Sequence, residues 1–128
     1  TNDEDLDLET FKNADKLLIE TVIHKKSDML GIWHQRFARM TTTNQNRLVL
    51  TYWLNKQQAD RFPGRPRQQY DLTNCKLERK NGTEFALVNA ISMNKIDDMI
   101  YPQVNVGFTL RLSQILNYKN YKVHLVHQ

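Results

Sequence analysis

The expected fold is decided by two consecutive runs, GIWHQRFARM at residues 31–40 and RLVLTYW at residues 47–53. In the second run, Leu48, Leu50 and Tyr52 alternate with Arg47, Val49 and Thr51. In the first run, Trp33 and Phe37 share one face, and Ile32, Ala38 and Met40 share the other. A period of two is that of a β-strand with one face turned toward a core. The polar segment TTTNQN between the runs suits a hairpin loop. The pattern therefore predicts two adjacent antiparallel strands.

The chain before these runs predicts another strand and a short helix. Residues 17–26, LLIETVIHKK, are rich in β-branched residues, which favour strands, and Ile19 and Ile23 fall on one face. In residues 8–18, apolar side chains recur at spacings of three and four, as on one face of a helix. Residues 1–7 are mostly acidic, and we expect a disordered tail there.

The strongest local signal is Asn81-Gly82 within CKLERKNGTEFALV. Both residues tolerate positive φ, which a type I′ turn requires at its two central positions. Strand-like runs lie on both sides of the dipeptide. We therefore predict a hairpin in which residues 74–80 pair with residues 83–89.

The remaining segments are assigned by chain breakers and by alternation. Two prolines and a glycine make residues 56–69 a long loop. Residues 90–103 have no clear period and are expected to be irregular. Alternating side chains predict strands at residues 104–112 and 121–127, with one helical turn at residues 113–118 between them.

Together these segments predict a small, mostly β fold, an antiparallel barrel or sandwich with a short N-terminal helix. Meandering strands joined by short loops usually close into a barrel or stack as two sheets. The length of 128 residues favours one domain, which we place at residues 8–128.

The charge of the chain is divided between its start and its body. Residues 1–20 hold seven acids and two lysines, a net charge of −5, whereas residues 21–128 hold seven acids and sixteen bases, a net charge of +9. A basic body attracts partners that carry phosphate, such as nucleic acid or anionic lipid. A generally solvated basic surface is the alternative explanation.

Cysteine use and hydropathy indicate the compartment. The single cysteine, Cys75, excludes an internal disulfide, and small secreted domains usually contain several. No apolar run approaches the roughly 20 residues that a bilayer-spanning helix needs, and the acidic first residues are unlike a signal peptide. We therefore expect a cytoplasmic protein, peripheral at a membrane and not transmembrane, or a nuclear protein.

Three motifs resemble the pleckstrin-homology (PH) superfamily, and within it the PH domain of anillin-type proteins. GIWHQR at residues 31–36 is similar to a Gly-x-Trp-His-x-Arg stretch of that family; it is followed by the aromatic pair at 52–53 and by YDLTNC at 70–75. Order and approximate spacing agree over about residues 19–90. The resemblance implies a barrel closed at one end by a C-terminal helix, usually with a tryptophan, but this chain has no tryptophan after position 53.

The resemblance also implies a site for inositol phosphates. In lipid-binding members, a lysine near the end of the first strand and a basic-x-Arg motif in the second bind the phosphates; these positions correspond to Lys26, His34 and Arg36. A tyrosine of the third strand, which often donates to a phosphate, corresponds to Tyr52. Arginine binds phosphate through two parallel hydrogen bonds, and lysine acts as a point charge. His34 stands where the family has lysine or arginine.

Further residues are candidates for contact with a membrane. Lys25, Arg65 and Arg67 extend the basic set, and each base near anionic lipid contributes roughly 1 kcal/mol to binding. Met29 and Leu30 lie in the segment after the lysine pair and are candidates for insertion into the bilayer interface. Packing of these two side chains onto the core is the alternative.

Signals of catalysis or of a cofactor do not occur in the sequence. There is no Gly-rich phosphate loop, no Gly-x-Ser-x-Gly and no zinc-ligand spacing, and the four histidines form no metal-like group. We therefore predict a non-catalytic module without metal or cofactor. It would bind anionic phosphoinositide headgroups and recruit a larger cytoplasmic protein to the membrane.

Three alternatives remain open. The first is a PH-like scaffold that binds a protein partner and has little affinity for lipid. The second is a nucleic-acid-binding β domain; the charge fits, but the aromatic and basic residues do not form one stripe. The third is a small enzyme with a cone-shaped α+β barrel that uses a His–Asp pair, although the sequence nominates no such pair.

Overall fold

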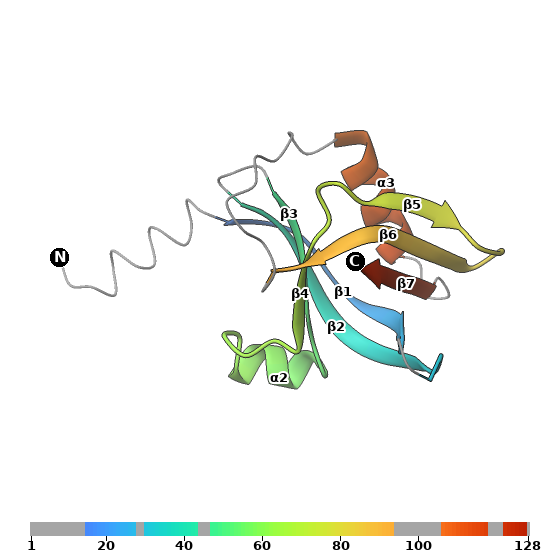
Figure 1. Ribbon diagram of the computed structural model, residues 1–128. Helices are drawn as coiled ribbons and strands as arrows, with labels where there is room; N and C mark the ends of the chain where they lie inside the picture. The colour runs from blue at the N-terminus through green and yellow to red at the C-terminus, as the bar shows by residue number, and fades with distance from the viewer. Residues whose placement is uncertain (1–14, 28–29, 44–46, 94–105, 118–121, 128) are drawn as a thin grey trace.

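A computed structural model describes residues 15–27, 30–43, 47–93, 106–117 and 122–127. The described residues form seven strands and two helices (Figure 1). The strands are β1 (Asp15–Lys26), β2 (Trp33–Thr43), β3 (Leu48–Trp53), β4 (Gln68–Asp71), β5 (Lys76–Arg79), β6 (Glu84–Ser92) and β7 (Lys122–His127). The helices are α2 (Lys56–Arg61) and α3 (Val106–Asn117). The mostly β fold predicted from alternation is confirmed.

Hydrogen bonding closes six of the strands into a barrel. The order around it is β4-β3-β2-β1-β7-β6, and β6 returns to pair with β4. β5 pairs with another part of β6 and is the additional strand. Most neighbours are antiparallel, but β7 runs parallel to both β1 and β6. The barrel is therefore an antiparallel meander into which the last strand is inserted in parallel.

The predicted hairpin at Asn81-Gly82 is present, because β5 pairs with β6 across it. Its turn is not type I′, however, since neither residue of the dipeptide has positive φ. The connection is instead closed by the Asn81 side chain, whose Oδ1 accepts hydrogen bonds from the backbone N–H of Thr83 at 3.3 Å and of Glu84 at 3.1 Å. Side chains of asparagine commonly stabilise turns in this way.

The predicted loop at residues 56–69 contains the short helix α2. Asn55 begins it, because its side chain accepts a hydrogen bond of 2.8 Å from the N–H of Gln58, as a favourable N-cap residue does. Pro63 follows shortly after the helix, and proline cannot continue one. The buried Ala59 packs the helix against Phe37 and Trp53 on the outer face of the barrel.

The predictions for the two ends of the chain are corrected. Residues 8–14 of the expected N-terminal helix lie outside the described residues, and residues 15–18 begin β1. The strand expected at residues 104–112 is replaced by α3, which starts at Val106. The helix is preferred because it buries Leu112, Ile115 and Leu116 on one face.

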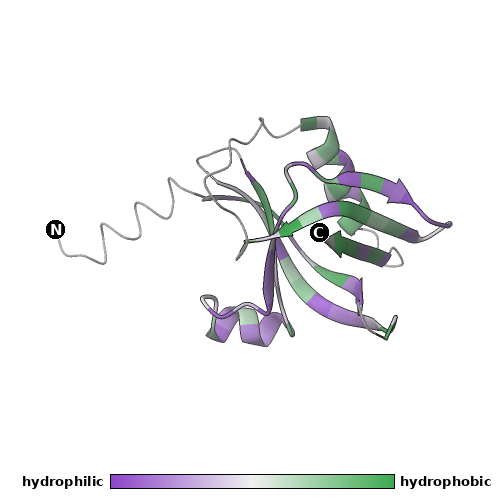
Figure 2. Ribbon diagram, viewed as in Figure 1, coloured by the Kyte–Doolittle hydropathy of each residue, from purple (hydrophilic) through white to green (hydrophobic). Residues whose placement is uncertain are grey.

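The barrel interior holds the main core. Met40, Leu48, Leu50, Leu72, Leu87, Leu112 and Leu125 are fully buried in it. Figure 2 shows hydrophobic residues recurring along β6 and β7, whereas α2 is largely hydrophilic. α3 completes the core beside β1, where Thr21 Oγ1 donates to the carbonyl of Leu116 at 3.3 Å. In Figure 1, α3 lies at the top of the barrel and α2 at the bottom.

Candidate anion-binding site at the barrel mouth

A pocket opens where β1 and β3 end and β2 and β4 begin. In Figure 1, these strand ends lie toward the bottom of the molecule. The volume of the pocket is about 490 Å³. We call it the mouth pocket; it is lined by Lys25, Ser27, Leu30, His34, Arg36, Tyr52, Arg67, Gln68 and Tyr70. Four neighbouring strands and their connections therefore contribute to one site.

The strand register explains why basic side chains meet here. In the antiparallel pair β1–β2, Lys25 lies opposite His34 and Ile23 lies opposite Arg36. Residues paired in this way project to the same face of the sheet. Ile23 and Ala38, which belong to that face, are buried in the core. On the face of the sheet that is turned to the core, Ile23 of β1 is therefore followed by Lys25, and Ala38 of β2 is preceded by Arg36. Both cations lie at the open end of the barrel.

The mouth pocket concentrates positive charge. Lys25, Arg36 and Arg67 are its cations, and no carboxylate is among the described residues that line it. Lys25 Nζ donates to the carbonyl of Lys26 at 3.3 Å, and Arg36 Nη1 donates to the carbonyl of Gln35 at 2.7 Å. Within the described part of the chain, neither side chain forms an ion pair with an acid. Among the described residues, therefore, no neighbouring acid offsets their charges.

Two tyrosine rings form an apolar wall behind these cations. Tyr52 and Tyr70 are nearly buried and stacked, with ring centroids 6.3 Å apart and an interplanar angle of 19°. The ammonium group of Lys25 lies 5.7 Å from the Tyr52 ring centroid, within cation–π range. A poorly polarisable wall strengthens the field that the cations produce in the pocket.

Lys26 does not line the mouth pocket, which corrects the expected convergence of Lys26 with Arg36. Successive residues of a strand point to opposite faces of the sheet. Lys26 therefore faces outward, where its Nζ lies 3.9 Å from Glu84 Oε1 and 5.7 Å from the centroid of the Trp33 ring. Its neighbour Lys25 is the lysine of β1 that reaches the site.

The other membrane-contact candidates are placed differently from one another. Arg67 lines the mouth pocket, but Arg65 lies outside it on an exposed segment, with its guanidinium carbon 5.9 Å from the Phe62 ring centroid. Leu30 lines the rim and is 75% exposed, so it is not folded onto the core. Met29 lies outside the described residues.

Sequence reasoning missed three lining residues, Ser27, Gln68 and Tyr70. Gln68 and Tyr70 belong to β4, in which Gln68 pairs with Tyr52 of β3. The strand-like YDLTNC motif contained this signal, because a strand next to Tyr52 must bring its own side chains to the mouth. Ser27 closes the turn after β1, where its carbonyl accepts from the N–H of Gly31, a residue with φ of 66°.

The other chemically notable side chain is Cys75, which is half-buried. Burial, together with the negative charge of Asp71, raises the pKa of its thiol from 9.0 to about 12. The thiol is therefore protonated at neutral pH and a poor nucleophile. Among the described residues, no three histidine, cysteine or acidic side chains gather as metal ligands. No helix in the described ranges is long and apolar enough to cross a membrane.

Comparisons with protein-family models, with curated proteins and with solved structures found no match to this chain. The resemblance to the PH superfamily therefore stays a prediction from sequence motifs. The functional argument rests on the charge and shape of the mouth pocket.

Proposed function

We propose that the mouth pocket binds the phosphate groups of phosphoinositide headgroups, and that the domain acts as a non-catalytic, PH-like module that recruits a larger cytoplasmic protein to an anionic membrane. One observation carries this proposal. Lys25, Arg36 and Arg67 line a single pocket, and no acid is among the described residues around them. A ligand with several negative charges is the partner that such a pocket favours.

The chemistry of the lining residues suits phosphate in particular. Arginine donates two parallel hydrogen bonds to phosphate oxygens, and lysine contributes a mobile point charge. His34, Ser27 and Gln68 add hydrogen-bonding groups along the walls. The volume of about 490 Å³ lies within the range of about 300–1,000 Å³ that is typical of small-molecule sites.

Co-sedimentation with vesicles of phosphatidylcholine, with and without a phosphoinositide, tests the proposal. The test variant is Lys25→Ala with Arg36→Ala. The control is Lys16→Ala with Lys76→Ala, which removes the same charge from exposed positions outside the mouth pocket. We expect phosphoinositide-dependent binding by the wild type and the control, and a loss of at least about tenfold in the test variant, because hydrogen bonds to charged groups contribute about 1.5–3 kcal/mol each.

Other outcomes favour the alternatives. A folded test variant that sediments like the wild type contradicts the assignment of the mouth pocket. Absence of vesicle binding, together with a protein partner that the test variant retains, favours a PH-like protein-interaction scaffold. Binding to an oligonucleotide with a steep dependence on salt favours a nucleic-acid-binding domain.

A further inference from the structure

A basic and apolar ridge lies beside the mouth pocket, in the connection between β3 and β4. It consists of Leu54, Arg61, Phe62 and Arg65, and we call it the Phe62 ridge. Leu54 is 44% exposed and Phe62 is 43% exposed. The guanidinium carbons of Arg61 and Arg65 each lie 5.9 Å from the centroid of the Phe62 ring. Two cations thus lie within cation–π range of one exposed aromatic ring.

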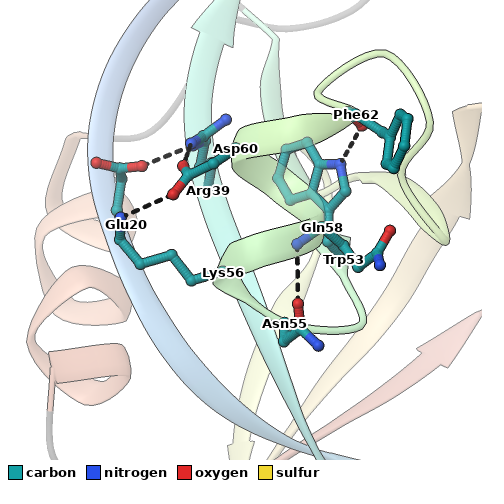
Figure 3. A network of polar contacts seen from close by, with 8 residues as sticks. All are labelled: Glu20, Arg39, Trp53, Asn55, Lys56, Gln58, Asp60 and Phe62. Atoms are coloured by element: carbon teal, nitrogen blue, oxygen red, sulfur yellow. Dashed lines mark hydrogen bonds and ion pairs between the residues drawn. The ribbon is translucent and has the colours of Figure 1, made fainter.

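The fold fixes this ring in place. The carbonyl of Phe62 accepts hydrogen bonds from Trp53 Nε1 at 3.2 Å and from the backbone N–H of Arg65 at 3.0 Å. Its own N–H donates to the carbonyl of Gln58 at 2.8 Å. In Figure 3 the Phe62 ring extends away from the Trp53 indole instead of packing on it. The exposure of the ring is therefore set by a well-bonded backbone.

Polar contacts also fix the helix that carries the ridge. Arg39 of β2 lies between Glu20 of β1, with Nε and Oε2 2.6 Å apart, and Asp60 of α2, with Nη2 and Oδ1 3.6 Å apart (Figure 3). Lys56 Nζ lies 3.1 Å from Oδ2 of Asp60. α2 is thus tied to two strands of the barrel, and the ridge has a defined orientation relative to the mouth.

The ridge lies at the same end of the molecule as the mouth pocket. Two residues after Arg65, the N–H of Arg67 donates to the carbonyl of Tyr52 at 2.9 Å, and both Arg67 and Tyr52 line the pocket. In Figure 1, α2 and the ends of β1 and β2 that join each other all lie at the bottom of the molecule. The connection between β1 and β2 forms the second rim of the mouth pocket. It carries Leu30 and Ile32, which are 75% and 50% exposed.

We propose that the Phe62 ridge is a second membrane contact: Phe62 and Leu54 enter the interface of an anionic bilayer while Arg61 and Arg65 bind lipid phosphates. This inference rests on the proposed function. Residues 61–69 contain three arginines and no acid, so their charge is complementary to an anionic lipid surface. Apolar side chains that are flanked by cations bind such interfaces by burial and electrostatic attraction together. When the Phe62 ridge and the connection between β1 and β2 both contact the bilayer, the mouth pocket faces the headgroup layer.

Paired variants separate contact with the bilayer from binding of the headgroup. The test variant is Leu54→Ala with Phe62→Ala. The matched control is Val106→Ala with Leu110→Ala, which removes side chains that are at least as exposed, 71% and 61%, from α3 at the top of Figure 1. The two readouts are affinity for vesicles of phosphatidylcholine, phosphatidylserine and a phosphoinositide, and affinity for a soluble inositol phosphate.

We expect the ridge variant to lose about tenfold in vesicle affinity, because two apolar contacts are removed, with no change in affinity for the soluble ligand. Arg61→Ala and Arg65→Ala are each expected to weaken vesicle binding about fivefold. The α3 control is expected to match the wild type in both readouts. An unchanged vesicle affinity, an equal loss in the control, or a parallel loss of soluble-ligand affinity overturns the inference.

A dye that responds to its environment gives an independent readout. In a Cys75→Ala background, the dye is attached to Phe62→Cys or to Leu110→Cys. We expect its emission to shift to the blue on vesicle binding at position 62 only; a shift at position 110 only overturns the inference. If the wild type binds vesicles through the ridge but binds no soluble inositol phosphate, the pocket proposal fails and the ridge stands. If Lys25→Ala with Arg36→Ala abolishes binding of the soluble inositol phosphate while the ridge variant keeps wild-type vesicle affinity, the ridge proposal fails and the pocket proposal stands.

Discussion

Lys25 and Lys26 are adjacent in β1 but face opposite sides of the sheet, so alanine substitutions at the two positions give a sharp test of the mouth pocket. We expect Lys25→Ala to weaken binding of a soluble inositol phosphate strongly and Lys26→Ala to change it little. The formal charge removed is the same in both variants. The two charges differ in their position relative to the pocket and in the side chains beside them.

The expected magnitudes follow from the surroundings of the two ammonium groups. Lys25 lines the pocket, and a hydrogen bond between charged partners contributes about 1.5–3 kcal/mol, or about 10- to 150-fold in affinity. Lys26 lies 3.9 Å from Glu84, so the pair has little net charge. The two side chains leave opposite faces of the sheet. Even at a separation of about 10 Å in physiological salt, one unit charge contributes only about 0.1 kcal/mol.

Isothermal titration calorimetry with a soluble inositol phosphate at physiological ionic strength measures both affinities. Thermal unfolding must be recorded as well, because Lys25 also contacts the Tyr52 ring and Lys26 the Trp33 ring. A soluble ligand is preferred to vesicles here, since a membrane also responds to the overall charge of the domain. Equal losses in the two variants, or a larger loss for Lys26→Ala, refute the reasoning and place the anion on the outer face of β1.

Four further predictions concern the fold and its one thiol. Leu125→Ala in β7, a fully buried position, is expected to lower the free energy of unfolding by about 2–5 kcal/mol in urea titrations; a change below about 1 kcal/mol would contradict the insertion of β7 into the core. The raised pKa of Cys75, about 12 when folded against 9.0, predicts slow alkylation of the native protein at mildly alkaline pH and fast alkylation in denaturant; similar rates would contradict it. The same shift predicts a stabilising contribution that is complete below pH 9 and is lost as the pH rises toward 12, seen as a pH-dependent difference in unfolding free energy between wild type and Cys75→Ala. Asn55→Ala removes the N-cap of α2 and is expected to cost about 1 kcal/mol, whereas Asn55→Asp retains the cap and should unfold like the wild type.

Alternation within single strands could be read from the sequence. It already indicated which lysine of β1 faces the mouth pocket. The core-facing set of β1 includes Ile23, and the period of two places Lys25, and not Lys26, on the same face. The resemblance to PH domains pointed to Lys26 instead. The pairing of Ile23 with Arg36 completes the argument, because it brings the two cationic strand ends to one opening.

The segment VNVGFTLRL at residues 104–112 shows where local patterns are ambiguous. Its apolar side chains recur at every second position, but Phe108, Leu112 and Ile115 also recur at helical spacing. The alternation predicts a strand. The tertiary structure decides for a helix, which buries Leu112 and Ile115 and leaves Leu110 at the surface. A single window of sequence cannot contain this information, since the partners of α3 come from β1.

Two other features differ from the prediction for different physical reasons. The parallel insertion of β7 depends on contacts such as Lys25 with Val123, between residues at opposite ends of the chain, and no local pattern specifies them. The helix α2 was, in contrast, signalled locally. Asn55 followed three residues later by Gln58 is typical of a helix N-terminus, but the proline and glycine further on dominated the interpretation.

The half-buried arginines of the strands give the strongest argument that the charge at the mouth serves binding. Arg39 pairs with Glu20 and Asp60, and Arg47 lies 3.9 Å from the buried Asp71. At both positions, the fold supplies an acid to a cation that is partly withdrawn from water. Arg36 is also partly buried, yet it forms no ion pair with any acid among the described residues. Repulsion among cations that lack acids destabilises a compact state. Among the residues that the structure describes, no acid relieves this repulsion at the mouth pocket, and cations without an acidic partner are open to an anionic ligand.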